Sequence, residues 1–238
     1  MKTIYSCLFI LTFFISCDTT PDSKSERMIN RELTNRTTNE LPGYNANPYD
    51  EAGWVHNELF ESYYESSSKP TSVSDIISRV QALADANPNF NSIKTATYRA
   101  VSAERINYIL EHKNTCVADI IAASSLTSKG KVSLSSFVNS LIVTFDTESN
   151  CDVLYKFVTD YEKVVLEDSL LTARDKQLIL TTTSIARHST YLAKKKPKKN
   201  TDPDWTILIV HIAAALDGAE YGLAESITEG LVAGIVSN

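Results

Sequence analysis

The spacing of hydrophobic residues predicts α-helices along most of the chain from residue 47 onward. Apolar positions three and four residues apart fall on one face of a helix, and such stripes recur in most segments of this part. Two examples are Ile76, Ile77, Val80, Leu83 and Ala84, and Leu134, Phe137, Val138, Leu141 and Phe145. Any strand pattern is confined to short runs such as residues 141–145. We therefore predict an all-α domain of about eight helices.

Polar residues at the ends of these stripes set the expected helix boundaries. Asn87-Pro88 should end a helix, because the residue before a proline is driven out of the helical conformation. Residues 92–113 read as one helix that can kink near Ser102, and residues 127–131 read as a polar turn. Two pairs have the three-residue spacing of a capping box at a helix start: Ser72 with Asp75, and Thr172 with Asp175.

The C-terminal segment, residues 203–236, is predicted to form one helix around which the others pack. Its first half is apolar nearly all round, which is typical of a central buried helix or of a membrane segment. The charge-free run, residues 205–216, is shorter than the roughly 20 residues needed to span a bilayer, so the central helix is favoured. Small residues recur every four positions and predict close helix packing: Ala214, Gly218 and Gly222, then Gly230 and Gly234. The rival interpretation is a membrane-active or dimerising helix.

The stretch "NPYDEAGWVHNELF", residues 47–60, begins the domain. Asn47 suits the N-cap of a helix over residues 48–64, Pro48 suits its first position, and Asp50 follows three residues after the cap. A helical wheel places His56 on the inward face, together with Ala52, Val55, Leu59 and Tyr63.

The same wheel places Trp54 on an exposed acidic face, with Glu51, Glu58, Glu61 and Glu65. Gly53 should let this helix approach the C-terminal helix near Gly218. The side chains of His56 and Asn57 should then hydrogen-bond to backbone or to nearby polar groups, because unpaired buried polar groups are costly.

The amino-acid composition indicates a globular protein and little more. The 238 residues carry a formal net charge of −6, with 43% apolar and 22% charged residues, which is ordinary for one folded domain. A mildly acidic chain gives no support for nucleic-acid binding, which needs a basic face.

The N-terminus predicts a lipid anchor. Residues 1–16 contain Lys2 and an apolar run that is typical of a secretory signal, and they end at Ser16-Cys17. A small residue before this cysteine resembles the lipobox of bacterial lipoproteins. By that resemblance cleavage precedes Cys17, whose thiol then carries diacylglycerol with acyl chains such as palmitate. Residues 17–46 would form a polar tether, and residues 47–238 the helical domain.

Candidate chemistry is sparse. A hydrolase could use His56 with Asp50 or Asn57, but a lone inward histidine is more often a core residue. The four histidines fall on four separate predicted helices, without metal-ligand spacing such as His-Glu-x₂-His, and a glycine-rich phosphate loop is lacking. We therefore expect no metal and no cofactor. Cys116 and Cys151 could form one disulfide outside the inner membrane, or could be two buried thiols.

The lipobox, the polar tether and "NPYDEAGWVHN" together resemble a group of Bacteroidetes-type lipoproteins. The shared signature covers Asn47, Pro48, Tyr49 and Asp50, then Gly53, His56 and Asn57. That group has no assigned activity, so the resemblance implies a place in the cell envelope and no mechanism. We expect an envelope protein, anchored in the outer membrane, that acts by binding a partner not specified by the sequence. The alternatives are the hydrolase and a membrane-perturbing, bacteriocin-like role of the C-terminal helix.

Overall fold

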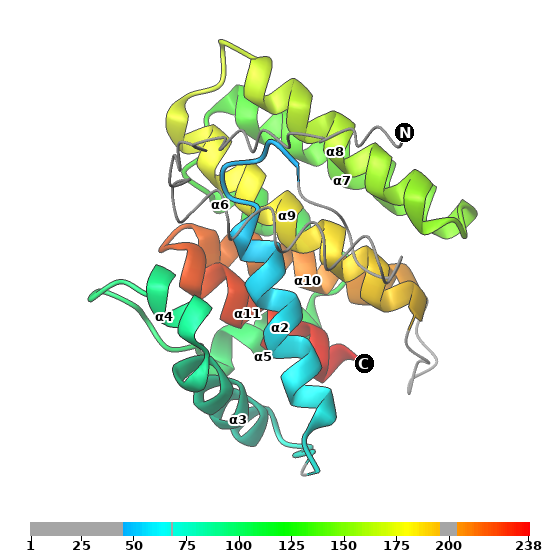
Figure 1. Ribbon diagram of the computed structural model, residues 1–238. Helices are drawn as coiled ribbons and strands as arrows, with labels where there is room; N and C mark the ends of the chain where they lie inside the picture. The colour runs from blue at the N-terminus through cyan, green and yellow to red at the C-terminus, as the bar shows by residue number, and fades with distance from the viewer. Residues whose placement is uncertain (1–44, 68, 196–203) are drawn as a thin grey trace, which may run out of the picture. The chain divides into compact units, whose positions relative to one another are not determined.

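The computed structural model describes residues 45–67, 69–195 and 204–238, with the side chains of 191–195 and 204 excepted. These residues form helices without any strand and belong to one packed unit. The helices, shown in Figure 1, are α2 (Glu51–Glu65), α3 (Val73–Ala86), α4 (Pro88–Ile93), α5 (Ala103–Glu111), α6 (Cys116–Ala123), α7 (Ser128–Thr147), α8 (Cys151–Glu167), α9 (Ala173–Lys195), α10 (Asp204–Ala219) and α11 (Leu223–Ser237). The predicted all-α class is confirmed.

Both predicted capping boxes start helices. The Ser72 hydroxyl accepts a hydrogen bond from the Asp75 amide at 3.1 Å and begins α3. At the start of α9 the exchange is mutual: the Asp175 amide donates to the Thr172 hydroxyl at 3.0 Å, and the Thr172 amide donates to the Asp175 carboxylate at 2.9 Å. These local bonds satisfy N–H groups that a helix start leaves unpaired.

Two predicted boundaries are wrong. The segment 92–113 is not one helix, because α4 ends at Ile93 and α5 begins only after Ser102, whose hydroxyl accepts from the Arg105 amide at 3.3 Å. Residues 127–131 are not a turn, because the Thr127 hydroxyl accepts from the Gly130 amide at 3.2 Å and caps α7. In both places a hydroxyl that could belong to a loop starts a helix instead.

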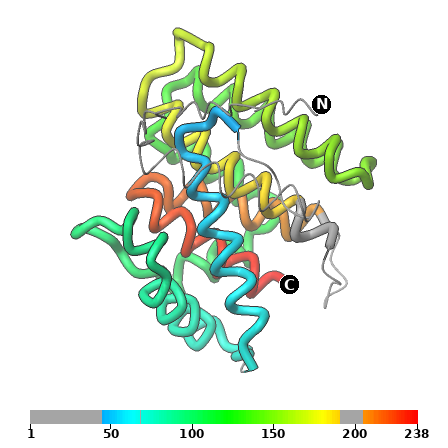
Figure 2. The backbone as a smooth tube through the Cα atoms, viewed as in Figure 1, coloured from blue at the N-terminus to red at the C-terminus, as the bar shows by residue number. Residues whose placement is uncertain are grey.

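Helix α9 occupies the centre of the domain. It packs against α2, α7, α8, α10 and α11, and α2 lies in front of it in Figures 1 and 2. Its residues 178–190 are buried without interruption. Leu178 and Ile185 are buried as predicted, whereas the side chain of Leu192 lies outside the described ones. The surrounding helices also bury the polar run Thr181, Thr182, Thr183 and Ser184.

The predicted single C-terminal helix is two helices that fold back on each other. The chain turns after Ala219, where the amides of Tyr221 and Gly222 both donate to the Gly218 carbonyl at 2.9 and 3.1 Å. A Cβ atom on Gly218 would lie 2.6 Å from the backbone of Glu225. Gly218 therefore serves packing between α10 and α11. The first helix does pack on the C-terminal segment, since α2 contacts α11, but the predicted position of that contact at Gly218 is wrong, because Gly218 meets α11.

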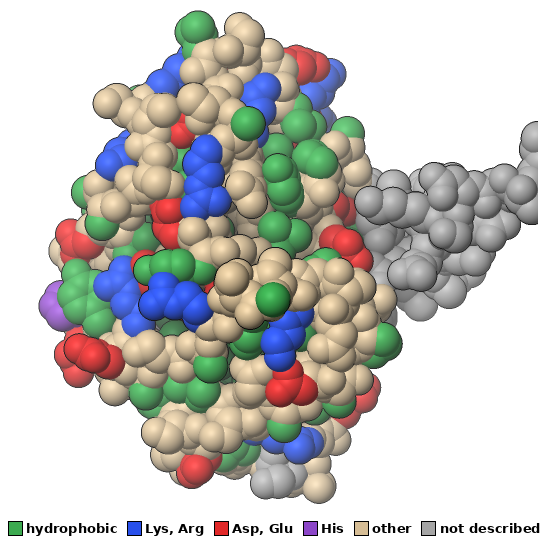
Figure 3. Space-filling view, turned by 90° about the vertical axis from the view of Figure 1, so that its left-hand side faces the viewer, with side chains coloured by type: hydrophobic (Ala, Val, Ile, Leu, Met, Phe, Trp, Pro, Cys, Tyr) green, Lys and Arg blue, Asp and Glu red, His purple; other side chains and the backbone are tan. Residues whose placement is uncertain are grey.

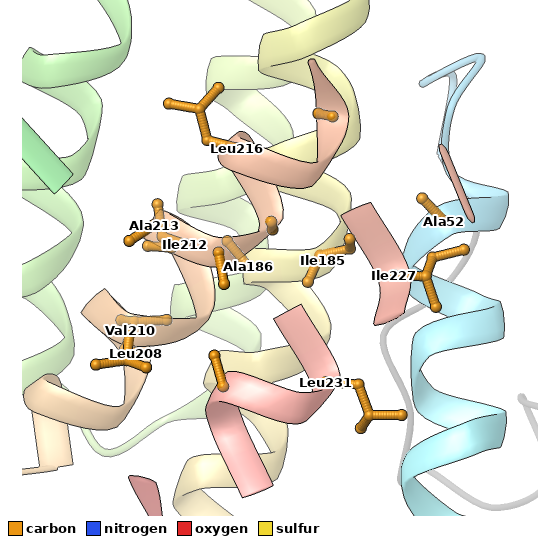
Figure 4. Close-up of a cluster of buried hydrophobic side chains, with 14 of the residues drawn as sticks. Ala52, Ile185, Ala186, Leu208, Val210, Ile212, Ala213, Leu216, Ile227 and Leu231 are labelled. Atoms are coloured by element: carbon orange, nitrogen blue, oxygen red, sulfur yellow. The ribbon is translucent and has the colours of Figure 1, made fainter. Parts of the chain in front are cut away.

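Apolar side chains of α9, α10 and α11 fill the space between these helices, and Ala52 of α2 joins them (Figure 4). Among the described residues, no helix combines the length and the apolar character that crossing a membrane requires.

Gly53 packs on α9 and not on the C-terminal segment. A Cβ atom there would lie 2.5 Å from the Ser184 carbonyl oxygen and would also clash with the His188 ring. Glycine at this position lets the two helix backbones approach each other.

We expect Gly53→Ala to lower the free energy of unfolding by about 1–3 kcal/mol, because the added methyl group overpacks the contact with α9. Gly230→Ala is the matched control, since its Cβ would meet nothing closer than 3.5 Å. That change should be neutral or should stabilise by up to about 1 kcal/mol through helix propensity. Denaturant unfolding at pH 7 measures both, and equal midpoints for the two variants would contradict the close packing of α2 on α9.

Candidate functional site

Asn47 connects α2 to two other helices. Its side-chain amide donates to the Glu162 carboxylate of α8 at 3.0 Å and to the Leu180 carbonyl of α9 at 2.9 Å. Its side-chain oxygen accepts from the Tyr49 amide at 2.8 Å within the turn that precedes α2. The predicted N-cap role of Asn47 is therefore wrong, since α2 begins at Glu51.

Asp50 lies at the centre of a buried polar cluster between α2 and α9. Its carboxylate accepts from the Trp54 indole at 3.0 Å and forms an ion pair with Arg187. Its backbone carbonyl accepts from the Ser184 hydroxyl at 3.0 Å, and the same hydroxyl accepts from the Gly53 amide at 2.9 Å. These five residues are called the Asp50 cluster below. Burial lowers the pKa of Arg187 to about 9, so the guanidinium remains charged at neutral pH.

The predicted exposure of Trp54 is wrong. Its side chain is only 4% exposed, and its ring meets the His188 ring edge-on with centroids 4.9 Å apart. The face that the helical wheel assigns to solvent is partly covered, because Asn87 and Asn89 donate to the Glu58 carboxylate. The indole N–H tolerates burial because Asp50 accepts its hydrogen bond.

Glu162 is a second buried carboxyl group beside the motif. It accepts hydrogen bonds from the side chains of Asn45, Asn47 and Thr183. Burial raises its pKa to about 7, and the three hydrogen bonds oppose that rise. Asn47 thus satisfies a buried acid, which is a structural role.

Three of the four histidines converge in the core. His56 of α2, His188 of α9 and His211 of α10 are at most 3% exposed, and the rings of His56 and His211 are 5.5 Å apart. His211 donates through Nδ1 to the Ile207 carbonyl at 3.0 Å. Burial lowers the pKa of all three, that of His211 to about 4. They are therefore neutral at pH 7.

The inward direction of His56 is confirmed, but its predicted hydrogen bonds are not. Within the described part of the chain, neither ring nitrogen of His56 has a hydrogen-bond partner, and the side-chain oxygen of Asn57 has none. No hydrogen bond between described residues joins His56 to Asp50 or Asn57. A general base must reach the proton that it abstracts, and His56 is fully buried. The described residues also include no group of ligands that could hold a metal ion.

Of the two alternatives for the cysteines, the structure has the free thiols: Cys116 is buried and Cys151 is half-buried. The helices that carry them share α7 as a neighbour, and otherwise α6 packs on α10 whereas α8 packs on α9. The Cys116 thiol donates weakly to the Lys113 carbonyl at 3.8 Å. Burial raises the pKa of this thiol to about 11, so it is a poor nucleophile at neutral pH.

A cleft lies where α5, α6 and the turn between α10 and α11 meet. It encloses about 480 Å³, and Figure 3 shows basic, acidic and hydrophobic side chains side by side on this face of the molecule. The polar residues that line the cleft are Arg99, Ser102, Arg105, Ser124, Asp217, Glu220, Tyr221 and Glu229. A hollow of about 520 Å³ over residues 110–115, Trp205 and Thr206 is larger. None of these described lining residues has a buried polar atom without a partner.

Most of the charges around the cleft are paired with each other. The Arg105 guanidinium makes two hydrogen bonds to Asp217, at 2.6 and 2.7 Å. Arg174 donates to the Glu220 carboxylate at 2.9 Å, and Ser125 donates to the same carboxylate. The Arg105 pair holds α5 on the end of α10, and the contacts of Glu220 hold the turn after α10 against the end of α6 and the start of α9.

Sequence reasoning did not find this cleft. The available signal was the presence of carboxyl groups, Asp217 and Glu229 among them, within an otherwise apolar tail. A comparison with protein families, curated proteins and solved structures found no match to this chain. The role of the cleft is therefore inferred from its own residues.

We expect Asp50→Ala to lower the free energy of unfolding by about 3–5 kcal/mol, because it leaves the buried Arg187 charge without its carboxylate. The control is Asp160→Ala, which removes the partner of Lys156 in an exposed pair on α8. Exposed pairs contribute at most about 1 kcal/mol. Denaturant unfolding compares the two variants, and a loss at Asp50 no larger than that at Asp160 would refute the structural role of the Asp50 cluster.

The buried histidines should make the fold sensitive to acid. Their folded-state pKa values lie below the ordinary value of 6.5, so below pH 6.5 the unfolded chain takes up protons that the folded chain does not, and stability falls. Between pH 7 and pH 5, the free energy of unfolding of His211→Gln should fall by about 2 kcal/mol less than that of the wild type, because each unit of difference in pKa corresponds to about 1.4 kcal/mol. The control His112→Gln changes an exposed ring that stacks on Tyr108 and should follow the wild type. Identical losses in all three proteins, measured by denaturant unfolding, would exclude the effect.

Proposed function

We propose that this protein is a lipid-anchored protein of the cell envelope that acts by binding a partner, without catalysis. The observation that supports a non-catalytic role is the burial of the motif residues Asp50, His56 and Asn57, each at most 3% exposed. Asp50 is engaged by Trp54 and Arg187. The hydrolase alternative would need these groups to be open to a substrate.

The fold also gives little support to a membrane-perturbing role. Nearly all residues of α10 and α11 are buried within the domain, and their apolar side chains pack against α9 and α2. An apolar surface for membrane insertion would require this hairpin to leave the core.

The anchor rests on the sequence, since Cys17 and nearly all of the 17–46 tether lie outside the described residues. A lipidated cysteine followed by a polar tether would hold the helical domain at a membrane surface, because each buried CH₂ of an acyl chain contributes about 0.8 kcal/mol. We propose the outer membrane as the site of attachment and expect no nucleic-acid partner.

We expect Cys17→Ala to move the full-length protein from the membrane fraction to the soluble fraction when it is produced in a bacterium that processes lipoproteins. Cys7→Ala is the matched control, because it changes another cysteine of the same N-terminal segment and should leave the protein in the membrane fraction. Fractionation with a high-salt wash, followed by mass spectrometry of the N-terminal peptide, measures both. A Cys17→Ala protein that stays with the membranes after the wash would disprove the anchor.

A further inference from the structure

The cleft holds a carboxyl group that the fold does not use. Glu229 is 8% exposed and lines the cleft. Its Oε2 atom is buried and has no hydrogen-bond partner among the described residues. A buried polar atom left unpaired costs roughly 1–3 kcal/mol, and no bond within the described residues offsets this cost.

The cleft also holds a cation that is not paired. The Arg99 guanidinium lies over the Tyr221 ring, 4.1 Å from its centroid, and Arg99 is exposed. Within the described part of the chain, no hydrogen bond or ion pair engages this guanidinium. The backbone amide of Arg99 donates to the Glu225 carboxylate at 2.9 Å, which holds the loop on α11. The guanidinium is thus positioned by its backbone and by an aromatic ring, with its N–H donors available.

The surroundings of Glu229 favour a positive charge. Burial is the main cause that raises its pKa, to about 8, and the carboxylates of Asp217 and Glu225 raise it further against the opposing effect of Arg105 and Arg99. At pH 7 Glu229 therefore holds a proton in the free protein. A ligand ammonium group beside it would favour the ionised form.

We propose that this cleft binds a small zwitterion, either a free amino acid or a short unblocked peptide, with its ammonium group at Glu229 and its carboxylate at Arg99. This inference rests on the proposed binding role and specifies its ligand class. Arginine recognises a carboxylate through two parallel hydrogen bonds, and a volume of about 480 Å³ lies within the range of small-molecule sites. On binding, the ammonium group keeps its protons and the Glu229 proton passes to the buffer.

Titration calorimetry at pH 7 tests this with L-alanine and alanyl-alanine, which separate the two sources of the zwitterion. We expect at least one of them to bind. In buffers of different ionisation enthalpy, the binding heat should show release of about one proton per ligand. N-acetyl-alanyl-alanine lacks the ammonium group and alanyl-alanine amide lacks the carboxylate. Each of these two probes should bind at least about tenfold more weakly than alanyl-alanine. If only L-alanine binds, the same comparison is made with N-acetyl-alanine and alanine amide, and each should bind at least about tenfold more weakly than L-alanine.

Two variants test which residue binds the ammonium group of the ligand and which binds its carboxylate. Glu229→Gln should weaken binding about tenfold or more and abolish proton release, whereas Arg99→Gln should weaken binding of the carboxylate-bearing probe and not that of the amide. Lys94→Gln is the control, because Lys94 lies over the Tyr98 ring outside the cleft, and it should bind like the wild type. Thermal melts report whether each variant folds. Should Glu229→Gln fail to fold, the exposed Arg99 and the probe series still decide the question.

Two results would overturn the inference: no binding of either zwitterion at millimolar concentration, or equal binding of the N-acetyl forms. Either result, with membrane attachment through Cys17 intact, would leave the proposed function standing. Mass spectrometry of the recovered probe separates the two claims. Cleavage of alanyl-alanine that is lost in Glu229→Gln would overturn the non-catalytic proposal and would support the site.

Discussion

The ion pair between Asp50 and Arg187 is the interaction on which the arrangement of the central helices depends. Helix α9 carries Arg187 into a position that is 1% exposed. Removing an ion from water costs several kcal/mol unless a partner of opposite charge and hydrogen bonds compensate for it. Asp50 compensates, and it does so from the residue directly before α2. The position of α2 along α9 is thereby tied to one carboxylate.

The rest of the "NPYD" turn follows from the same constraint. Asn47 donates to the Leu180 carbonyl of α9 and to the buried Glu162. Gly53 lets the Ser184 hydroxyl reach the α2 backbone, where it both donates to Asp50 and accepts from Gly53. The polar residues of this stretch, which suggest a catalytic site in the sequence, thus serve to pair with polar groups of the buried helix α9.

The contrast between the core and the cleft lies in how their polar groups are used. In the core, Asp50 accepts from Trp54 and pairs with Arg187, Glu162 accepts from Asn45, Asn47 and Thr183, and the three histidines are neutral because burial disfavours their charge. Around the cleft, Asp217 and Glu220 are paired with arginines, while the Oε2 atom of Glu229 and the guanidinium N–H groups of Arg99, which lie over the Tyr221 ring, have no hydrogen-bond partner among the described residues. Both of these residues line the cleft.

Hydrophobic spacing and capping chemistry are local properties, and they determined a good part of this protein from sequence alone. Ser72 and Thr172 start helices because their hydroxyls bond to amides three residues away, and the inward direction of His56 follows from its place among apolar neighbours on one face. Tertiary structure decided what those faces meet. A helical wheel places Trp54 toward solvent because it cannot represent the neighbouring helices, and the apolar pattern of the tail predicts one helix although Gly218 allows the chain to fold back. The meeting of three histidines and the cleft around Glu229 both join residues far apart in the chain, and such contacts are set by the packing of whole helices.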